Sequence, residues 1–154
     1  MSEERPNRIP WPPVLYAAVL IVAFALNRLV PLDWFGWAWG WTPIGAAMAL
    51  IGLALLAAGL LAFWRIGTPF DPVKRAEALA TGGVYAWTRN PMYLGMTIAF
   101  IGLGLAFASE WLVILSLLMP LALQKLAIER EERHLEARFG DAWRAYAAGV
   151  RRWI

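Results

Sequence analysis

The chain contains no cysteine and only one histidine among its 154 residues. Without cysteine it can form no disulfide, has no thiol nucleophile and lacks the Cys/His clusters that hold zinc or iron–sulfur groups. The single histidine, His134, has no serine or cysteine close to it in the sequence that would make a nucleophile–base pair, and we expect it at the surface. We therefore expect no metal site, no redox chemistry and no catalytic triad.

Charged residues are also scarce. They make up 16% of the chain, whereas hydrophobic residues make up 60% and include ten tryptophans. This composition is too apolar for an ordinary soluble domain and indicates an integral membrane protein. The net charge of +3 does not indicate nucleic-acid binding, because the basic residues flank apolar stretches instead of forming one stripe. In such positions they typically face the head groups of membrane lipids.

Four apolar stretches occur along the chain, at about residues 14–30, 44–64, 92–108 and 111–126. The first two approach the roughly 20 residues that a helix needs to cross the hydrocarbon core. The last two are shorter and follow each other almost directly, which predicts a tight helical hairpin, and we expect Pro120 to kink the fourth. We therefore predict an all-α, four-helix integral-membrane protein that ends in a cytosolic amphipathic helical segment.

The distribution of basic residues predicts the orientation of these helices. Thirteen of the fourteen lie before the first stretch, between the second and third, or from the end of the fourth onward. With four spans these segments share one face, which the positive-inside bias makes cytoplasmic, so both termini are expected in the cytoplasm. The fourteenth is Arg28, next to Asn27. Either Asn27 is a helix cap and Arg28 extends its charge to the membrane surface, or both belong to a binding site. The thirteen are Arg5, Arg8, Arg65, Lys74, Arg75, Arg89, Lys125, Arg130, Arg133, Arg138, Arg144, Arg151 and Arg152.

Small residues recur at helical spacing in the second and third stretches. They are seven positions apart in the second, and alternately four and three positions apart in the third. Such seams allow helix backbones to approach closely in lipid, within one chain or between two chains of an oligomer. Packing therefore explains these residues, which are Gly45, Gly52, Gly59, Gly95, Ala99, Gly102 and Ala106.

A polar block precedes the third stretch. Asn90 is a good helix N-cap and Pro91 suits the first helical turn, so part of the block is explained as the start of a helix. This explanation leaves out Arg89 and Tyr93. Arg89 is either an interfacial arginine that reaches lipid head groups or part of a binding site.

A pair of acids, Glu131 and Glu132, follows the fourth stretch. At about 100° per residue both fall on the apolar face of a helix. An acid on the buried face of a helix that leaves the membrane is costly unless it is paired or functional. Either the pair forms an internal ion pair with Arg89 or Lys125, or it belongs to a site. The apolar residues of this face include Leu135 and Phe139.

Several short motifs in the second half keep a fixed order and spacing: GVY at 83–85, RNPMYLG at 89–95, EERHL at 131–135, FGDAWRAY at 139–146 and VRRWI at 150–154. With these motifs, residues 81–154 resemble the catalytic half of the integral-membrane methyltransferases related to isoprenylcysteine carboxyl methyltransferase. Phospholipid N-methyltransferases are more distant relatives. Two positions depart from the pattern: Asn90 stands where eukaryotic enzymes usually have histidine, and Arg151 where many members have proline.

The resemblance implies an S-adenosylmethionine-dependent methyltransferase. It implies that the cofactor binds on the cytosolic side under the last hairpin and is capped by the C-terminal segment. It also implies catalytic roles for Arg89, Glu131 and Glu132. The cofactor-binding residues expected from it are Tyr85, Arg89, Asn90, Pro91, Tyr93, Leu94, Gly95, Glu131, Glu132, Leu135 and Phe139.

The chemistry of these residues agrees with that cofactor, which carries an ammonium, a carboxylate and a sulfonium. Acids, a guanidinium and electron-rich rings bind such groups. We expect Glu131 and Glu132 to hold the ammonium and offset the sulfonium, and Arg89 to bind the carboxylate. Tyr85 and Tyr93 would then line the pocket, and the wall beside the adenosine would be formed by Leu135 and Phe139.

The acceptor is expected to be lipophilic, because a site inside a membrane hairpin is reached laterally between helices. A carboxylate, amine or thiol of an isoprenoid or phospholipid would fit. Residues 1–80 match no motif and are expected to select the acceptor, while residues 81–154 bind the cofactor within the same membrane domain. One alternative is a non-catalytic membrane subunit that uses the same scaffold for assembly. A dimeric transporter is a weaker alternative, since residues 14–26, 44–64 and 92–108 contain no Asp, Glu, Lys, Arg or His.

Overall fold

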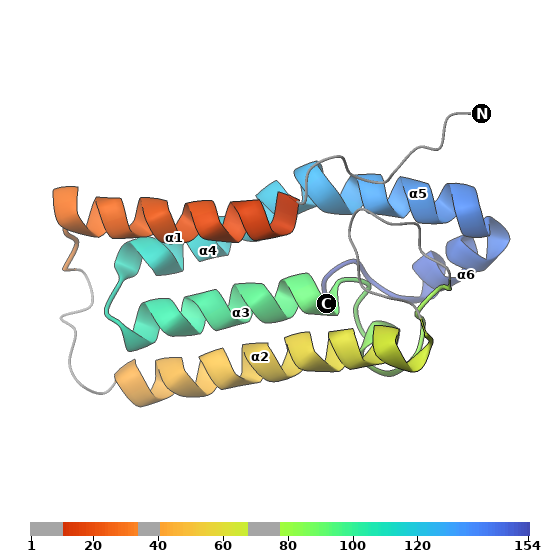
Figure 1. The fold of residues 1–154 in the computed structure, drawn as a ribbon, viewed down its shortest axis with the longest axis horizontal. Coiled ribbons are helices and arrows are strands. Elements are labelled where there is room, and N and C mark those ends of the chain that lie inside the picture. Colours follow the sequence, from red (N-terminus) through yellow and green to blue (C-terminus); the bar gives the residue numbers. More distant parts are fainter. Residues whose placement is uncertain (1–10, 34–40, 68–77) are drawn as a thin grey trace.

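A computed structural model describes residues 11–33, 41–67 and 78–154. These residues form helices and connecting turns, with no strand among them, so the predicted all-α fold is confirmed. The long helices lie side by side, and the shorter C-terminal helices extend from one end of the bundle (Figure 1). The elements are α1 (Trp11–Leu29), α2 (Trp41–Arg65), η1 (Gly83–Ala86), α3 (Pro91–Ala106), α4 (Glu110–Leu123), the π turn η2 (Gln124–Ile128), α5 (Glu129–Phe139) and α6 (Asp141–Gly149).

Three helical segments of the described chain are long and apolar enough to cross a membrane: Pro12–Leu29, Trp41–Arg65 and the continuous run Glu110–Phe139. α3 is also apolar but has 16 residues, or about 24 Å of helix against roughly 30 Å of hydrocarbon. The apolar helices support a membrane protein, as predicted. That all four helices cross the bilayer stays a prediction.

The helices pack in the order α1, α4, α3, α2, which differs from their order along the chain (Figure 1). α1 contacts α4, and α2 contacts α3, so each N-terminal helix packs on the C-terminal half. The two halves expected from the sequence therefore share one core. Its buried side chains are Tyr16, Ala23, Tyr93, Phe100, Leu112, Met119, Leu123 and Ile128.

Glycines bring the backbones of α2 and α3 into contact. A Cβ on Gly52 would lie 2.5 Å from the carbonyl oxygen of Gly95, and one on Gly102 would lie 2.6 Å from that of Gly45. No side chain fits such spaces, so the predicted seam joins these two helices. Gly95, which the resemblance placed in the cofactor set, faces α2 in this contact.

The predicted hairpin between α3 and α4 is confirmed, with a turn of three residues between them. The hydroxyl of Ser109 caps α4 by accepting a hydrogen bond from the Leu112 N–H at 3.2 Å. It also accepts one from Asn27 Nδ2 at 2.6 Å, which ties α1 to this turn. The guanidinium of Arg28 lies over the Phe24 ring, 5.0 Å from its centroid. Asn27 and Arg28 thus have partners within α1 and the hairpin.

α4 continues into α5 through the π turn η2, one helical turn after Pro120. Proline has no N–H, so the carbonyl of Ser116 loses the donor that an α-helix would supply. A π turn holds more residues than an α turn and therefore changes the face that the following residues present. The helix thus runs on past the apolar stretch and carries Glu131 and Glu132 to the end of the bundle.

Candidate functional site

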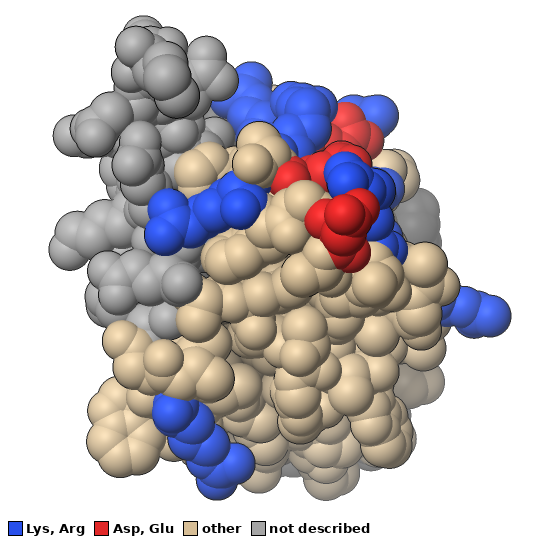
Figure 2. All heavy atoms as spheres, turned by 90° about the vertical axis from the view of Figure 1, so that its right-hand side faces the viewer, with Lys and Arg blue, Asp and Glu red and all other residues tan. Residues whose placement is uncertain are grey.

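Charged side chains gather at the end of the molecule where α5 and α6 lie, above a largely uncharged surface (Figures 1 and 2). A pocket of about 420 Å³ opens among them. Seven of its nine lining residues are charged, and they come from α5, α6, the segment before α3 and the C-terminus. The lining residues are Arg89, Glu129, Glu132, Arg133, Glu136, Trp143, Arg144, Ala147 and Arg152.

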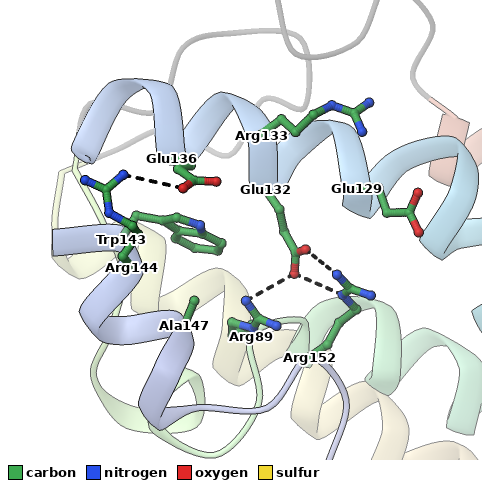
Figure 3. Close-up of a pocket in the computed structure, with 9 residues that line it drawn as sticks. All are labelled: Arg89, Glu129, Glu132, Arg133, Glu136, Trp143, Arg144, Ala147 and Arg152. Carbon is green, nitrogen blue, oxygen red and sulfur yellow. Dashed lines mark hydrogen bonds and ion pairs between the residues drawn. The ribbon is translucent and has the colours of Figure 1, made fainter. Parts of the chain in front are cut away.

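Glu132 lies between two arginines in this pocket (Figure 3). Arg152 donates to both of its carboxylate oxygens, from Nε at 3.1 Å and from Nη2 at 2.6 Å. Arg89 Nη1 lies 3.4 Å from Oε1 of the same carboxylate. For Glu132 the structure thus shows one of the two alternatives left open by the sequence, an internal ion pair with Arg89. Lys125, the other expected partner, pairs with Glu129 at 2.8 Å.

Arg89 has hydrogen-bonding capacity that the described residues do not use. Its side chain is 15% exposed, and its buried Nε has no hydrogen-bond partner among the described residues. Its guanidinium lies 5.6 Å from the centroid of the buried Trp143 ring, a cation–π contact. Such an N–H beside an aromatic wall is suited to bind an anionic group of a ligand.

The C-terminal segment is held across the start of α3 by three hydrogen bonds. The carbonyl of Arg152 accepts one from Thr88 Oγ1 at 3.1 Å and one from Asn90 Nδ2 at 3.0 Å. The carbonyl of Arg151 accepts one from the backbone N–H of Arg89 at 2.9 Å. These bonds hold the chain beside the pocket and place the Arg152 guanidinium on Glu132.

Asn90 stands at the N-cap position of α3, as predicted, but its side chain makes no capping hydrogen bond. Its amide instead donates to the C-terminal segment, and its own backbone N–H donates to Thr88 Oγ1 at 3.2 Å. The prediction that the Asn90 side chain caps the helix was therefore wrong, because a partner distant in the sequence offers its carbonyl to the amide. Pro91 occupies the first turn as expected.

Glu131 faces a different environment from Glu132. Its Oε1 accepts a hydrogen bond from the hydroxyl of Tyr93 at 2.7 Å. The backbone carbonyl of Tyr85 accepts a hydrogen bond from the Tyr146 hydroxyl at 2.7 Å, and its ring lies edge-on to Phe63, with the ring centroids 5.5 Å apart. Burial, then Tyr146 and Glu131, raise the pKa of Tyr85. The adjacent acids thus diverge, one toward tyrosines and the other toward arginines.

The wall of the pocket differs from the expected one. Leu135 and Phe139 are half-buried on α5 and do not line it, whereas the ring of Trp143 does. The reason is the turn at Gly140, where φ is 54° and α6 folds back over the side of α5 that carries Glu132. His134, expected at the surface, is half-buried.

The remaining expected residues do not line the pocket either. Pro91 and Tyr93 are buried and Leu94 is half-buried in the first turns of α3. Lys74 and Arg75, with Arg5 and Arg8, lie outside the described residues.

Several pocket residues were missing from the expected set. Trp143, Arg144 and Arg152 lie in motifs that carry the family resemblance, and this was the available signal for them. The spacing of Glu129, Glu132 and Glu136 places these acids on one helix face, which is the face that lines the pocket. No sequence signal marks Ala147.

Comparisons with known proteins agree with this fold. A solved structure of the eukaryotic intramembrane Ras methyltransferase ICMT (isoprenylcysteine carboxyl methyltransferase) matches with a TM-score of 0.62 and 24% sequence identity. The match covers 94% of this chain and 52% of that protein, so this chain spans about half of its length. The expected fold of isoprenylcysteine carboxyl methyltransferase is thus confirmed.

Two sequence matches complete the comparison. An uncharacterized protein from Haemophilus influenzae is 35% identical over 69 residues, which are 45% of this chain and 84% of that protein. The family model of the phospholipid methyltransferases matches residues 41–142, from α2 into the first turn of α6. Because this match covers well over half of the chain, the protein belongs to the phospholipid methyltransferase family.

Proposed function

We propose that this protein is a membrane methyltransferase that uses S-adenosylmethionine and methylates a lipophilic acceptor. Family membership supports methyl transfer as the class of reaction. The observation that carries the proposal is the charged pocket at the end of an apolar helix bundle. In it, Glu132 fixes two arginines, and Arg89 keeps a buried N–H without a partner among the described residues.

The residues of the pocket fit the cofactor in size and chemistry. A volume of about 420 Å³ lies within the roughly 300–1,000 Å³ of small-molecule sites. The N–H of Arg89 that bonds to no described residue suits the carboxylate of S-adenosylmethionine, and the acids of α5 suit its ammonium and sulfonium. The ring of Trp143 offers a flat apolar surface for the adenine. Because both oxygens of Glu132 are bonded, its main task is to hold Arg89 and Arg152.

Methyl transfer from this cofactor asks little covalent chemistry of the protein. When bound, S-adenosylmethionine would supply a methyl group on positively charged sulfur. An acceptor lone pair would attack the methyl carbon and displace the sulfur directly. The residues of this chain then have to align the reactants and exclude water. The bonds from Thr88 and Asn90 to the C-terminal segment serve this purpose, because they keep the segment beside the pocket.

The position of the pocket supports a lipophilic acceptor. It lies at the end of the bundle, beyond helices that are apolar enough to cross a membrane. Trp64 at the end of α2 and Trp87 before α3 are 78% and 84% exposed. Exposed tryptophans of this kind are typical of the membrane interface. A lipid in the bilayer can therefore reach the site, whereas the charged pocket faces the aqueous side.

The test is a calorimetric titration of the purified full chain in detergent with S-adenosylmethionine and S-adenosylhomocysteine. We expect binding by the wild type and a loss of at least about tenfold in affinity for Glu132→Gln, since a buried charge pair is broken. The matched control is Asp33→Asn, because this acid is exposed after the end of α1 and does not line the pocket.

No heat of binding with either compound would contradict the proposed enzyme. That result would favour the second candidate, a non-catalytic membrane subunit. The internal ion pair of Glu132 is compatible with such a subunit, because it is complete without a ligand. Circular dichroism of the Glu132→Gln variant separates a loss of binding from a loss of fold.

A further inference from the structure

The charged residues of α5 are sorted by sign onto two faces of the helix. At about 100° per residue, its acids fall within one arc of about 160°, and its arginines fall within a separate arc of about 140°. Three of the acids, among them Glu132, line the pocket. The arginines are Arg130, Arg133 and Arg138, which we call the arginine row, and all three are exposed. α5 therefore carries a basic surface beside the pocket.

The arginine row forms no ion pair with any described residue, although α5 is rich in acids. The guanidinium of Arg138 lies over the ring of Phe139, 5.7 Å from its centroid. The side chain of Arg133 points away from Glu132 (Figure 3). Each guanidinium offers several N–H donors and a fixed positive charge. These groups are available to an anion that comes from outside the described chain.

The helix that carries the arginine row also exposes leucines. Leu117, Leu118 and Leu121 of α4 are 60%, 54% and 67% exposed, and they belong to the continuous helical run Glu110–Phe139. From Leu121 to Arg130 the helix rises by about 14 Å. One leaflet of a bilayer holds about 15 Å of hydrocarbon. The exposed leucines therefore lie at the depth of the acyl chains when Arg130 lies at the head groups of the same leaflet.

Other residues at the same end of the bundle agree with this depth. The last turn of α2, which carries Trp64, lies at the end where α5 and α6 extend (Figure 1). Trp64 and Trp87 are largely exposed, as is typical of side chains at the level of the head groups. The positive-inside bias predicts that this end faces the cytoplasm, and the cytoplasmic leaflet is the one that holds anionic lipids.

We propose that α4 and α5 together bind an anionic phospholipid, with its acyl chains on the exposed leucines and its phosphate on the arginine row. Arg130 and Arg133 are three positions apart, so they are neighbours on the helix surface and can share one phosphate. An acidic peptide would use the arginines but not the leucines. This lipid has a binding role and is not the methyl acceptor, so the inference does not depend on the proposed function.

The experiment uses the full chain in neutral maltoside micelles, titrated with dioleoylphosphatidylglycerol. Dioleoylphosphatidylcholine, which has the same acyl chains but no net charge, is the matched lipid. Native mass spectrometry measures the affinity for the first bound lipid. We expect the wild type to prefer the anionic lipid by about tenfold or more, and Arg130→Gln to bind it about fivefold more weakly, because one arginine contact is lost. Arg130→Gln combined with Arg138→Gln should reduce the preference to about twofold.

Arg28→Gln is the matched control, because it also removes one exposed arginine, at the end of the bundle that holds the α3–α4 turn. It should bind the anionic lipid like the wild type. Glycerol 3-phosphate offers a phosphate without acyl chains and should not bind. The site is overturned if the two lipids bind equally well, if Arg130→Gln changes nothing or loses no more than Arg28→Gln, or if glycerol 3-phosphate binds as tightly as the lipid. Should Arg130→Gln not fold, Arg138→Gln decides.

Discussion

At the scale of single residues, function in this protein depends on partners that lie far apart in the sequence. Asn90 sits where a helix cap is expected, yet its amide holds the carbonyl of Arg152, 62 residues away. Thr88 donates to the same carbonyl. A short side chain before a helix can thus serve either the helix or a neighbouring segment, and here the segment is the chain end beside the pocket.

Asn90→Ala is therefore expected to loosen the C-terminal segment. One hydrogen bond to a backbone carbonyl contributes about 1 kcal/mol, so amide exchange in residues 147–154 should become several-fold faster. Hydrogen-exchange mass spectrometry measures this directly. Asn27→Ala is the matched control, because it removes a hydrogen bond of a side-chain amide at the far end of the bundle. Unchanged exchange in Asn90→Ala would contradict the role, and Asn90→His should restore protection because imidazole also offers an N–H.

Tyr85 and Tyr146, which is bonded to the Tyr85 backbone, give a second prediction at this scale. Tyr85→Phe removes a buried hydroxyl without a described partner, so stability should stay the same or rise by up to about 1 kcal/mol. Tyr146→Phe removes a donor that bonds the Tyr85 carbonyl, and stability should fall by about 1 kcal/mol. Thermal unfolding in detergent compares the variants, and the opposite order would contradict the assignment of partners.

At the scale of elements, close helix packing positions the site. α2 and α3 approach at their glycines, so α3 presents Tyr93 and the residues before it in a fixed place. On the other side, the π turn η2 and the turn at Gly140 set the faces that α5 and α6 present. The π turn η2 and the turn at Gly140 both depart from a regular α-helix. Together with the contact of α2 and α3, they determine where the acids of α5 point.

Gly52→Ala tests the seam between α2 and α3. The added Cβ would lie 2.5 Å from the carbonyl oxygen of Gly95, so two backbones have to separate. We expect a loss of about 1–3 kcal/mol or more in stability, measured as a lower unfolding temperature in detergent. Gly82→Ala is the control, because a Cβ there meets nothing within 4 Å. Equal unfolding temperatures for the two variants would refute a tight seam.

At the scale of the whole molecule, the two ends of the bundle differ in character. One end carries the charged pocket, and the opposite end carries the short turn between α3 and α4 with the exposed Phe107 (Figure 1). The positive-inside bias predicts that the charged end faces the cytoplasm, where S-adenosylmethionine and its product are dissolved. Orientation in the membrane thus decides whether the pocket can meet its proposed cofactor.

The absence of cysteine allows a clean test of this orientation. Single cysteines replace Phe107, at the turn, and Ala148, on the exposed surface of α6. A membrane-impermeant maleimide added to intact cells should label Phe107→Cys, and should label Ala148→Cys only after lysis. Labelling of Ala148→Cys in intact cells would reverse the predicted topology.

Hydropathy and helical periodicity determined the class of this protein from its sequence. Apolar runs indicated the helices, and small residues indicated the close contact between α2 and α3. The helical period of about 100° per residue placed both acids on the apolar face of α5. These properties depend on neighbours within a few turns, which is why they can be predicted. The motifs of residues 81–154 indicated the family. The match to the family model and the match to the solved structure agree with it.

Only the tertiary structure decided which partner each of these residues has. Glu132 meets Arg152 because the chain end is bonded to the segment before α3, and Glu131 meets Tyr93 because α5 passes the first turn of α3. Trp143 replaces Leu135 and Phe139 on the pocket wall because α6 folds back at Gly140. Such contacts depend on how distant segments pack, and a local pattern of residues carries no information on that packing.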